Sequence, residues 1–254
     1  MKKIREFKEE KVSEFVAASI IVGSLLLCVV LSFVGFLDNR QKEEQAVQNV
    51  NAKVEPQSRA KPEADGYRQL DDPMLVLVNE DVPLPDDWKV TPRMIDDEQV
   101  DLRMYEDLTA MIDAGAKEDV WFWIASGYRS VEQQEMILER AIEDNIKKGM
   151  NRKAAREEAL KTIAEPGHSE HHTGLAVDLN DVSDDFEQTK AYRWLSEHAA
   201  EYGFVQRYQK DKVDITGIDN ESWHYRYVGP EHAQEMKRLN LCLEEYVAYL
   251  WEKE

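Results

Sequence analysis

The longest run of hydrophobic positions in this 254-residue chain lies near its N-terminus. Residues 15–37 read FVAASIIVGSLLLCVVLSFVGFL and contain no charged side chain. As a helix this stretch would be about 34 Å long, enough to cross the hydrocarbon core of a membrane. The pattern therefore predicts an uncleaved transmembrane anchor. The alternative is a cleaved signal peptide, but its apolar region is usually shorter, and this stretch offers only a poor small-x-small cleavage site.

Basic residues are distributed unevenly around this segment. Residues 1–14 contain five of them, whereas the 15 residues after the segment contain two. Because Lys and Arg accumulate on the cytoplasmic side of membrane helices, we expect residues 1–14 in the cytoplasm and the rest of the chain outside.

Residues 38–72 are polar and show little periodicity. Their Gln, Glu, Lys and Pro content is typical of a flexible stalk, with an additional helix near residues 40–50 as the alternative. Beyond the stalk, residues 73–254 are long enough to form one domain.

Helical and strand-like patterns are interspersed along residues 73–254. Because they do not alternate as regular βαβ units, they favour an α+β fold with a small antiparallel sheet and helices to one side. Apolar residues at helical spacing predict helices over residues 100–114, 130–148, 151–164, 189–202 and 230–251. In the first of these, the predicted buried stripe consists of Leu102, Tyr105, Leu108 and Ile112. Short apolar runs predict strands over residues 120–126, 174–179, 204–208 and 223–228.

Composition excludes two classes of protein. The formal net charge is −19, from 32 basic and 51 acidic residues, which argues against nucleic-acid binding. The two cysteines lie in the predicted anchor (Cys28) and in the last predicted helix (Cys242), so a disulfide framework and a thiolate zinc site are both excluded. We expect Cys242 to be an inert, partly buried thiol.

Three of the six histidines lie in PGHSEHHTGLAVDLN, residues 166–180. His171 and His172 are adjacent, and in an extended segment they would point to opposite faces, so that only one could join a given site. Asp178 lies in an apolar strand pattern, where a carboxylate is costly unless it is paired or bound to a metal.

A second polar group occurs in ESWHYRYVG, residues 221–229, where Glu221 and His224 are three residues apart. Two neutral imidazoles and one carboxylate form a ligand set that suits Zn²⁺ with one open position. Zinc lowers the pKa of a bound water from about 15.7 to about 7, and a nearby glutamate that is not a ligand can then act as general base. On the residues alone, capping histidines, a solvated Glu221 and a turn-forming Asp178 remain open.

The motifs then become familiar as a set. SEHHTGLAVDLN and ESWHYRYVG resemble the metal motifs SxHxxGxAxD and ExxWH of the VanY-type D-alanyl-D-alanine carboxypeptidases, a zinc peptidase family. The segments LVLVNEDVPLP, SGYRSVEQQ and GFVQRYQKDKVDITG are also similar to that family and follow its order, so the resemblance covers about residues 74–230. It implies the α+β fold shared with hedgehog-type domains.

The resemblance also implies roles for individual residues. It implies that Glu221 is the general acid/base and that Arg129 steadies the scissile carbonyl and its developing oxyanion. Ser169 and Gln134 match positions that contact the peptide. The implied zinc ligands are His171, Asp178 and His224.

Two positions depart from the family pattern. His172 stands where the family usually has Gln, and Ser222 stands where it usually has Pro. Neither change removes a catalytic group. We expect His172 to be exposed, and His168 to be a loop residue rather than a fourth ligand.

The combined expectation is a membrane-anchored, extracytoplasmic zinc carboxypeptidase that removes the C-terminal D-alanine from peptidoglycan stem peptides. An L,D-carboxypeptidase that trims tetrapeptide stems is an alternative within the family. A catalytically silent peptidoglycan-binding module and a structural membrane-tethered protein are alternatives of other classes. The intact set of five metal-binding and catalytic groups argues against the last two.

Overall fold

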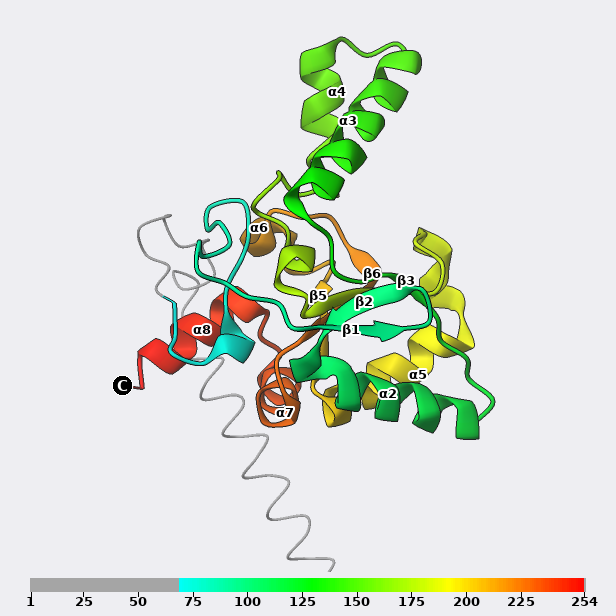
Figure 1. Cartoon of the computed structure of the whole chain (residues 1–254), viewed down its shortest axis with the longest axis vertical. Helices are drawn as coiled ribbons and strands as arrows, with labels where there is room; N and C mark the ends of the chain where they lie inside the picture. The colour runs from blue at the N-terminus through cyan, green and yellow to red at the C-terminus, as the bar shows by residue number, and fades with distance from the viewer. Residues whose placement is uncertain (1–68, 254) are drawn as a thin grey trace, which may run out of the picture. The chain divides into compact units, whose positions relative to one another are not determined.

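Residues 69–253 are described by the structure, which is a computed structural model (Figure 1). The predicted cytoplasmic segment 1–14, the anchor 15–37 and all but the last four residues of the predicted stalk 38–72 lie outside these described residues. Within residues 69–253, no helix combines the length and the apolar character needed to cross a membrane.

The centre of the fold is a four-stranded antiparallel sheet with the strand order β3-β4-β6-β5. Every residue of the two central strands is buried, because both faces of the sheet are covered. The register places Asp178 of one central strand opposite His224 of the other. The strands are β3 (Ile124–Ser126), β4 (Ala176–Leu179), β5 (Phe204–Tyr208) and β6 (Glu221–Tyr227).

Three helices lie on one side of this sheet (Figure 1). They are α2 (Leu102–Lys117), α5 (Lys190–His198) and α7 (Pro230–Leu239). The short 3₁₀ helix η5 (Ala199–Tyr202) extends α5 as far as Gly203, as predicted. The main hydrophobic core includes Leu108 and Met111 of α2, Leu195 of α5, Val177 of β4 and Tyr225 of β6.

The buried side of α2 differs from the predicted stripe. Leu108 is buried as expected, but Leu102 is 42% exposed, and Tyr105 and Ile112 lie only at the edge of the core. The helix instead buries Met104, Leu108, Met111 and Gly115. Asp101 caps the helix N-terminus, so Leu102 is the first helical residue and lies outside the stripe.

A two-stranded hairpin precedes α2 and was not predicted. It consists of β1 (Pro92–Ile95) and β2 (Glu98–Asp101), paired antiparallel. Its turn contains Asp96 with a positive φ of 50°, a conformation that Asp tolerates better than most residues. The acidic sequence IDDE lacks the glycine that usually signals such a turn, which is why the pattern did not reveal it.

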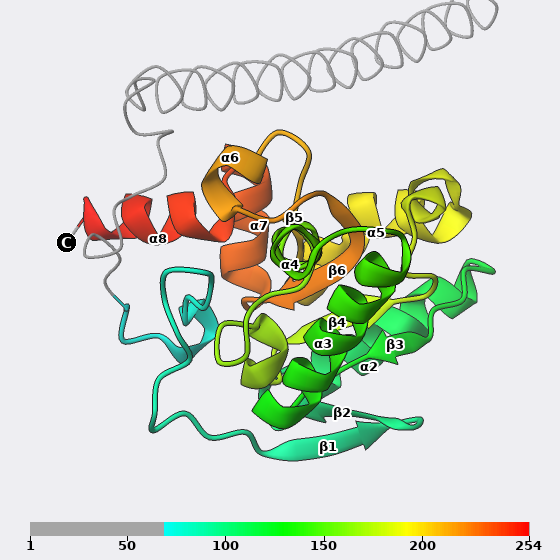
Figure 2. The same cartoon turned by 90° about the horizontal axis from the view of Figure 1, so that it is seen from above.

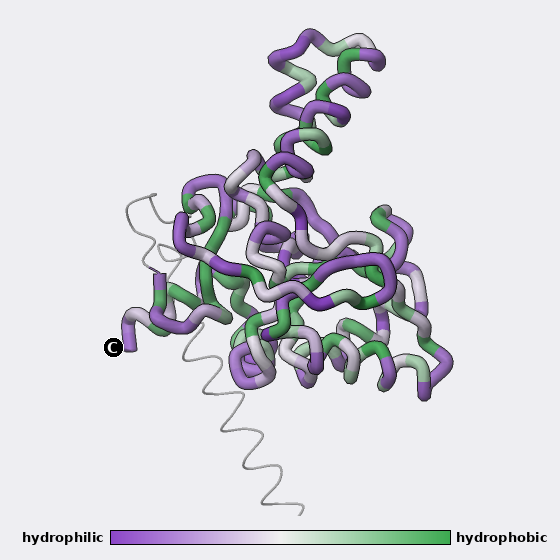
Figure 3. Tube along the Cα trace, in the orientation of Figure 1, coloured by the Kyte–Doolittle hydropathy of each residue, from purple (hydrophilic) through white to green (hydrophobic). Residues whose placement is uncertain are grey.

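The predicted pair of charged helices is confirmed as a hairpin of α3 (Val131–Lys147) and α4 (Arg152–Ala159), separated near Gly149. It projects from the sheet on the side opposite α2 (Figures 1 and 2). Most of its surface is hydrophilic (Figure 3). The hairpin has a small hydrophobic cluster of its own, formed by Leu138, Ile142, Ala155 and Ala159.

The predicted last helix is two helices. The first, α7, ends at Asn240, whose left-handed φ of 54° terminates it. The second, α8 (Leu243–Trp251), begins after Cys242, which is its N-cap residue rather than a residue inside a helix. Burial raises the pKa of the Cys242 thiol, in keeping with the inert thiol that was expected.

Short elements complete the described chain. Gln69, from the predicted stalk, forms hydrogen bonds to both the backbone N–H and the carbonyl of Leu77, so the folded part of the chain includes it. The remaining elements are η2 (Pro73–Leu75), η3 (Glu170–Thr173), η4 (Asp184–Gln188) and α6 (Val213–Thr216). The predicted strand 204–208 is confirmed as β5, whereas only residues 124–126 of the predicted strand 120–126 pair as β3. The predicted α+β fold with a small antiparallel sheet is confirmed.

Candidate active site

The three predicted metal ligands meet on the face of the sheet opposite α2. His171 lies in η3, Asp178 in β4 and His224 in β6. All three are buried, and one ligand atom from each lies within 4.8 Å of the others. The Nε2 atom of His171 is 3.3 Å from Asp178 Oδ2, and the Nδ1 atom of His224 is 3.0 Å from Asp178 Oδ1. Among the described residues, this is the one cluster of its kind with a metal-binding geometry.

The tautomer of His171 is fixed by the backbone. Its Nδ1 lies 2.7 Å from the carbonyl oxygen of Gly127. Because a carbonyl can only accept, Nδ1 must carry the proton, which leaves the Nε2 lone pair facing Asp178. Burial lowers the pKa of His171 to about 4, and the nearby Arg129 charge acts in the same direction. His171 is therefore neutral near pH 7, as a metal ligand must be.

His224 is oriented by carboxylates on both sides. Its Nδ1 faces Asp178, and its Nε2 lies 3.5 Å from Glu170 Oε2. Burial lowers the pKa of His224, but hydrogen bonding to Asp178 and Glu170 outweighs burial and raises it to about 9. The Nε2 atom and Glu170 Oε2 are buried without any other hydrogen-bond partner. A carboxylate behind a histidine is a common arrangement around bound zinc, so this donor set fits that ion.

Arg129 lies directly beside Asp178. Its NH2 group is 2.6 Å from Asp178 Oδ2, and its Nε donates to Ser126 Oγ at 2.7 Å. Gln134 lies behind it, with its side-chain oxygen 3.5 Å from Arg129 NH1 and its amide donating to the carbonyl of Ala164. The guanidinium is thus held in place at the edge of the predicted metal site.

Glu221 begins β6 and lies just outside the ligand set. Its Oε2 atom is 3.7 Å from His224 Nδ1. Burial raises the pKa of Glu221 to about 8, and the neighbouring Asp178 charge raises it further, against the opposing effect of His224. A carboxyl group with a pKa near neutrality, next to a metal site, is suited to exchange protons during a reaction.

All seven predicted site residues line one cavity of about 390 Å³. Ser169 caps η3 through its Oγ, which accepts from the N–H of His171 at 3.3 Å. The rest of the wall comes from the α3–α4 hairpin, the segment after β4 and the end of the sheet. It includes Ile137, residues 162–164, Val182, Tyr208, Ile218 and Trp223.

The expected exposure of His172 is wrong. His172 is only 2% exposed, because residues 170–173 form a 3₁₀ turn rather than an extended segment, and both neighbouring histidines turn inward. Its Nδ1 donates to the carbonyl of Arg129 at 2.8 Å, and its Nε2 accepts from the N–H of Gly167 at 3.0 Å. His172 therefore braces the backbone that carries Arg129. His168 is a loop residue whose Nδ1 lies 2.7 Å from the carbonyl of Asn79, outside the metal group.

A buried ionic network behind the ligands was missed by sequence reasoning. Arg207 and Arg226 both donate to Glu170 Oε1 at 2.8 Å, and Arg207 also pairs with Glu244 of α8. All four side chains are completely buried. The network fixes Glu170, which faces His224. Arginines inside strands predicted as buried were the available signal, but the partner at residue 244 could not be inferred from local pattern.

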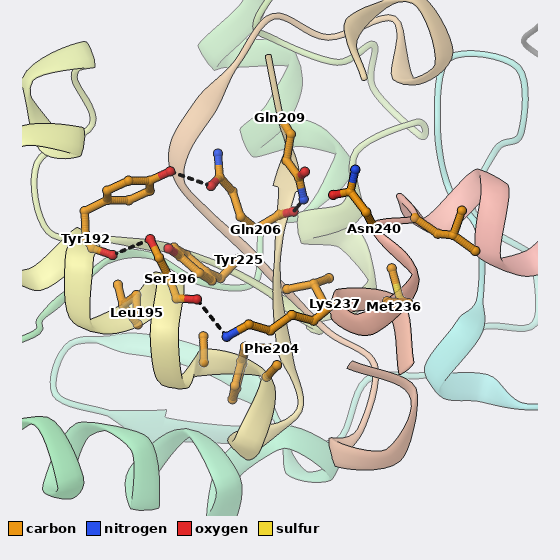
Figure 4. Close-up of a pocket in the computed structure, with 14 residues that line it drawn as sticks. Tyr192, Leu195, Ser196, Phe204, Gln206, Gln209, Tyr225, Met236, Lys237 and Asn240 are labelled. Carbon is orange, nitrogen blue, oxygen red and sulfur yellow. Dashed lines mark hydrogen bonds between the residues drawn. The ribbon is translucent and has the colours of Figure 1, made fainter. Parts of the chain in front are cut away.

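A second cavity, of about 210 Å³, lies on the other side of the sheet between α5, β5 and α7 (Figure 4). Tyr225 contributes to it from β6, because neighbouring residues of a strand point to opposite faces and His224 faces the metal site. None of the seven predicted site residues lines this cavity.

An α+β fold whose central strands carry a buried His₂Asp set, with a glutamate of raised pKa beside it, defines a metallopeptidase-type centre. The family model described as "VanY: D-alanyl-D-alanine carboxypeptidase" matches residues 97–230. The chain belongs to the VanY D-alanyl-D-alanine carboxypeptidase family, as the motifs predicted.

Known proteins of this family are similar to the chain over most of its described part. A D-alanyl-D-alanine carboxypeptidase of Enterococcus faecalis is 40% identical over 174 residues, which cover 68% of this chain and 65% of that protein, just under two thirds of its length. The D,D-pentapeptidase VanY of a VanB-type vancomycin resistance cassette has been solved in complex with Zn(II). That structure matches with a TM-score of 0.64 and 40% identity, over 69% of this chain and 99% of that one.

Two further structures are informative about ligands and specificity. VanYB in complex with D-alanine-D-alanine matches with a TM-score of 0.64 and 40% identity, over 69% of this chain and 97% of that one. The LD-carboxypeptidase LdcB, whose structure concerns peptidoglycan recognition, matches with a TM-score of 0.60 and 30% identity, over 75% of this chain and 95% of that one.

Proposed function

We propose that the protein is a zinc-dependent D-alanyl-D-alanine carboxypeptidase that removes the C-terminal D-alanine from peptidoglycan stem peptides. The observation that carries this proposal is the convergence of His171, Asp178 and His224 within 4.8 Å, with Glu221 beside them in one cavity. Zinc bound there would polarise the scissile carbonyl and lower the pKa of a coordinated water.

Glu221 is the residue that moves protons in this account. Its pKa of about 8 allows it to take a proton from the attacking water and to pass it to the amine of the leaving D-alanine near neutral pH. It lies 3.7 Å from His224, close enough to serve the reacting atoms without being a ligand itself.

Arg129 supplies positive charge at the other side of the ligands. Its guanidinium is held by Ser126 and Gln134 and borders the same cavity. A preorganised cation stabilises the negative charge that develops on the carbonyl oxygen, and the low exposure of the site strengthens this effect. Ser169 and Gln134 line the cavity and are positioned to contact the peptide.

D,D-specificity is favoured over L,D-specificity. The relatives that act on or bind D-alanyl-D-alanine are 40% identical, whereas the LD-carboxypeptidase LdcB is 30% identical. A silent binding module has no use for a buried glutamate of raised pKa beside a complete ligand set.

The proposal includes a location. A membrane helix over residues 15–37, with residues 1–14 in the cytoplasm and a stalk over residues 38–72, would place the catalytic domain outside the membrane, where peptidoglycan lies. The uncharged run and the excess of basic residues before it support this arrangement.

The test uses full-length protein in detergent micelles, incubated with stem peptides of four and five residues. We expect the pentapeptide to lose the mass of one alanine, while the tetrapeptide stays intact. A chelator should abolish the reaction, and added zinc should restore it. Shortening of the tetrapeptide instead would establish L,D-activity, and binding of both peptides without cleavage would establish a silent module.

A further inference from the structure

Two tryptophans are unusually exposed next to the sheet. Trp121 is 69% exposed and Trp123 is 49% exposed, whereas Val120, Phe122 and Ile124 between and beside them are buried. The alternation shows an extended segment that leads into β3, with one side in the core and the other in solvent. Neighbouring indoles presented on one side of a surface strand indicate a contact with a ligand rather than a contribution to the core.

The register shows which face of the sheet the indoles occupy. Ile124 pairs with Leu179, and both belong to the hydrophobic core. Neighbouring residues of a strand point to opposite faces. Trp123, next to Ile124, therefore points to the face of Asp178, which is next to Leu179. Trp121 follows two residues away on that same face.

The backbone of this segment is held rigidly by Asn180. The side-chain oxygen of Asn180 accepts from the N–H of Trp123 at 3.0 Å, and its side-chain amide donates to the carbonyl of Trp121 at 3.1 Å. Its own N–H donates to the carbonyl of Trp123 at 2.9 Å. Asn180 is buried and adopts a left-handed φ of 59°. The two indoles are thus presented on a fixed backbone, which reduces the entropy cost of binding a ligand.

The indoles continue the wall of the active-site cavity. Val182, two residues after Asn180, lines that cavity and is itself 55% exposed. With about 3.3 Å per strand residue and about 4.8 Å between strands, Trp123 lies roughly 8 Å from Asp178 along the sheet, and Trp121 roughly 15 Å.

These distances match the geometry of the proposed substrate. In a pentapeptide stem, the sugar is attached at the end opposite the D-alanine that is removed. An extended chain spans at most about 3.3–3.6 Å per residue, so the sugar lies roughly 13 Å from the scissile bond. The apolar C–H face of a pyranose ring can stack on an indole, as other flat apolar groups do.

The charge around the indoles favours a neutral partner. Asp119 and Asp181, both exposed, flank the segment in sequence, and Glu118 precedes it. This acidic surrounding opposes an anionic lipid surface or an anionic wall polymer. An N-acetylhexosamine ring carries no charge and meets no such repulsion.

We propose that Trp121 and Trp123 form a stacking platform that binds an N-acetylhexosamine ring of the glycan to which the stem peptide is attached. This inference rests on the proposed function, because it assigns a sugar subsite to the same substrate. It predicts that the enzyme prefers stem peptides that still carry their sugar.

The test compares free pentapeptide with disaccharide-linked pentapeptide on full-length protein in detergent. In the Trp121→Ala/Trp123→Ala variant, kcat/KM for the sugar-linked substrate should fall about tenfold, mainly through KM, as expected for lost stacking. The value for the free peptide should stay near that of the unchanged protein. Met94→Ala removes an equally exposed hydrophobic side chain from β1 and should alter neither substrate. Trp121→Tyr/Trp123→Tyr should restore most of the preference.

A binding measurement separates this inference from the proposed function. The peptide-free disaccharide is titrated into the protein, and indole fluorescence is followed. Saturable quenching that disappears in the double alanine variant supports the platform, even if no peptide is cleaved. Equal losses for both substrates, or an unchanged preference together with no quenching, would overturn it. Failure to cleave either peptide, with quenching retained, would count against the proposed function alone.

Discussion

The two nitrogens of the His224 ring face different carboxylates. Nδ1 lies 3.0 Å from Asp178, and Nε2 lies 3.5 Å from Glu170. These partners raise the pKa of His224 to about 9 although burial alone would lower it. The ring is therefore protonated near pH 7 before a metal binds, and it must lose that proton to become a ligand.

Zinc binding should consequently depend on pH. Below about pH 9, binding displaces one proton from His224, so the apparent zinc affinity should rise about tenfold per pH unit. Competition with a chromophoric chelator at pH 6, 7 and 8 measures this slope. Glu170→Gln, which removes one charge that raises the pKa, should flatten it. An affinity that does not change over this range would show that His224 binds zinc without losing a proton.

The ligand assignment itself is tested by metal content. His171→Ala and His224→Ala should each lose most of the bound zinc, because a structural three-residue ligand set cannot spare one member. The matched control is His172→Gln, which removes the adjacent buried imidazole but retains a donor and an acceptor for the carbonyl of Arg129 and the N–H of Gly167. Retained zinc in both alanine variants, measured by elemental analysis, would show that the assignment is incorrect.

At the scale of elements, the buried network ties η3, β5, β6 and α8 together. Glu170 belongs to η3, Arg207 to β5 and Arg226 to β6, while Glu244 lies at the start of α8. Each arginine is fully buried and satisfied by at least one carboxylate at 2.8 Å. The same charges that hold these elements in register also fix the carboxylate behind His224.

Removal of one member of this network should be costly. Arg207→Met leaves Glu170 and Glu244 short of a buried partner, and such losses typically cost about 3–5 kcal/mol. Arg152→Met is the matched control, because its pair with Glu139 on the α3–α4 hairpin is exposed and contributes little. Urea denaturation monitored by circular dichroism gives both free energies of unfolding. Similar values for the two variants would mean that the network does not stabilise the domain.

At the scale of the whole molecule, the sheet separates structure from chemistry. The helices α2, α5 and α7 cover one face and supply the core, whereas the other face carries the metal ligands and the α3–α4 hairpin (Figure 1). The proposed membrane anchor precedes this domain and would hold it close to the membrane surface.

Residues 15–37 should remain attached in the mature protein, because the uncharged run lacks a good cleavage site. Intact-mass analysis of protein extracted from membranes decides this point. A mature chain that begins near residue 38 would replace the anchor with a cleaved signal peptide.

Local signals explain what the sequence could predict. The caps and glycines around α3, α4 and α5 defined helices, and the apolar runs around Asp178 and His224 defined the two central strands. The metal ligands followed from motif order along the chain. By contrast, the inward turn of His172 depends on the 3₁₀ geometry of η3, and the break at Asn240 depends on one left-handed residue. The ionic network needed contacts between residues 170, 207, 226 and 244, which only the folded chain brings together.

The central claim is that Glu221 performs proton transfer beside a zinc site to which it does not contribute. Glu221→Gln keeps the size of the side chain but cannot accept a proton. General acid–base groups contribute about 10²–10⁴-fold, so kcat for the pentapeptide should fall at least that far. Zinc stoichiometry, measured on the same preparation, should stay at that of the unchanged protein. Near-normal kcat would remove Glu221 from the mechanism, and zinc lost in step with activity would make it a ligand, which would contradict the account.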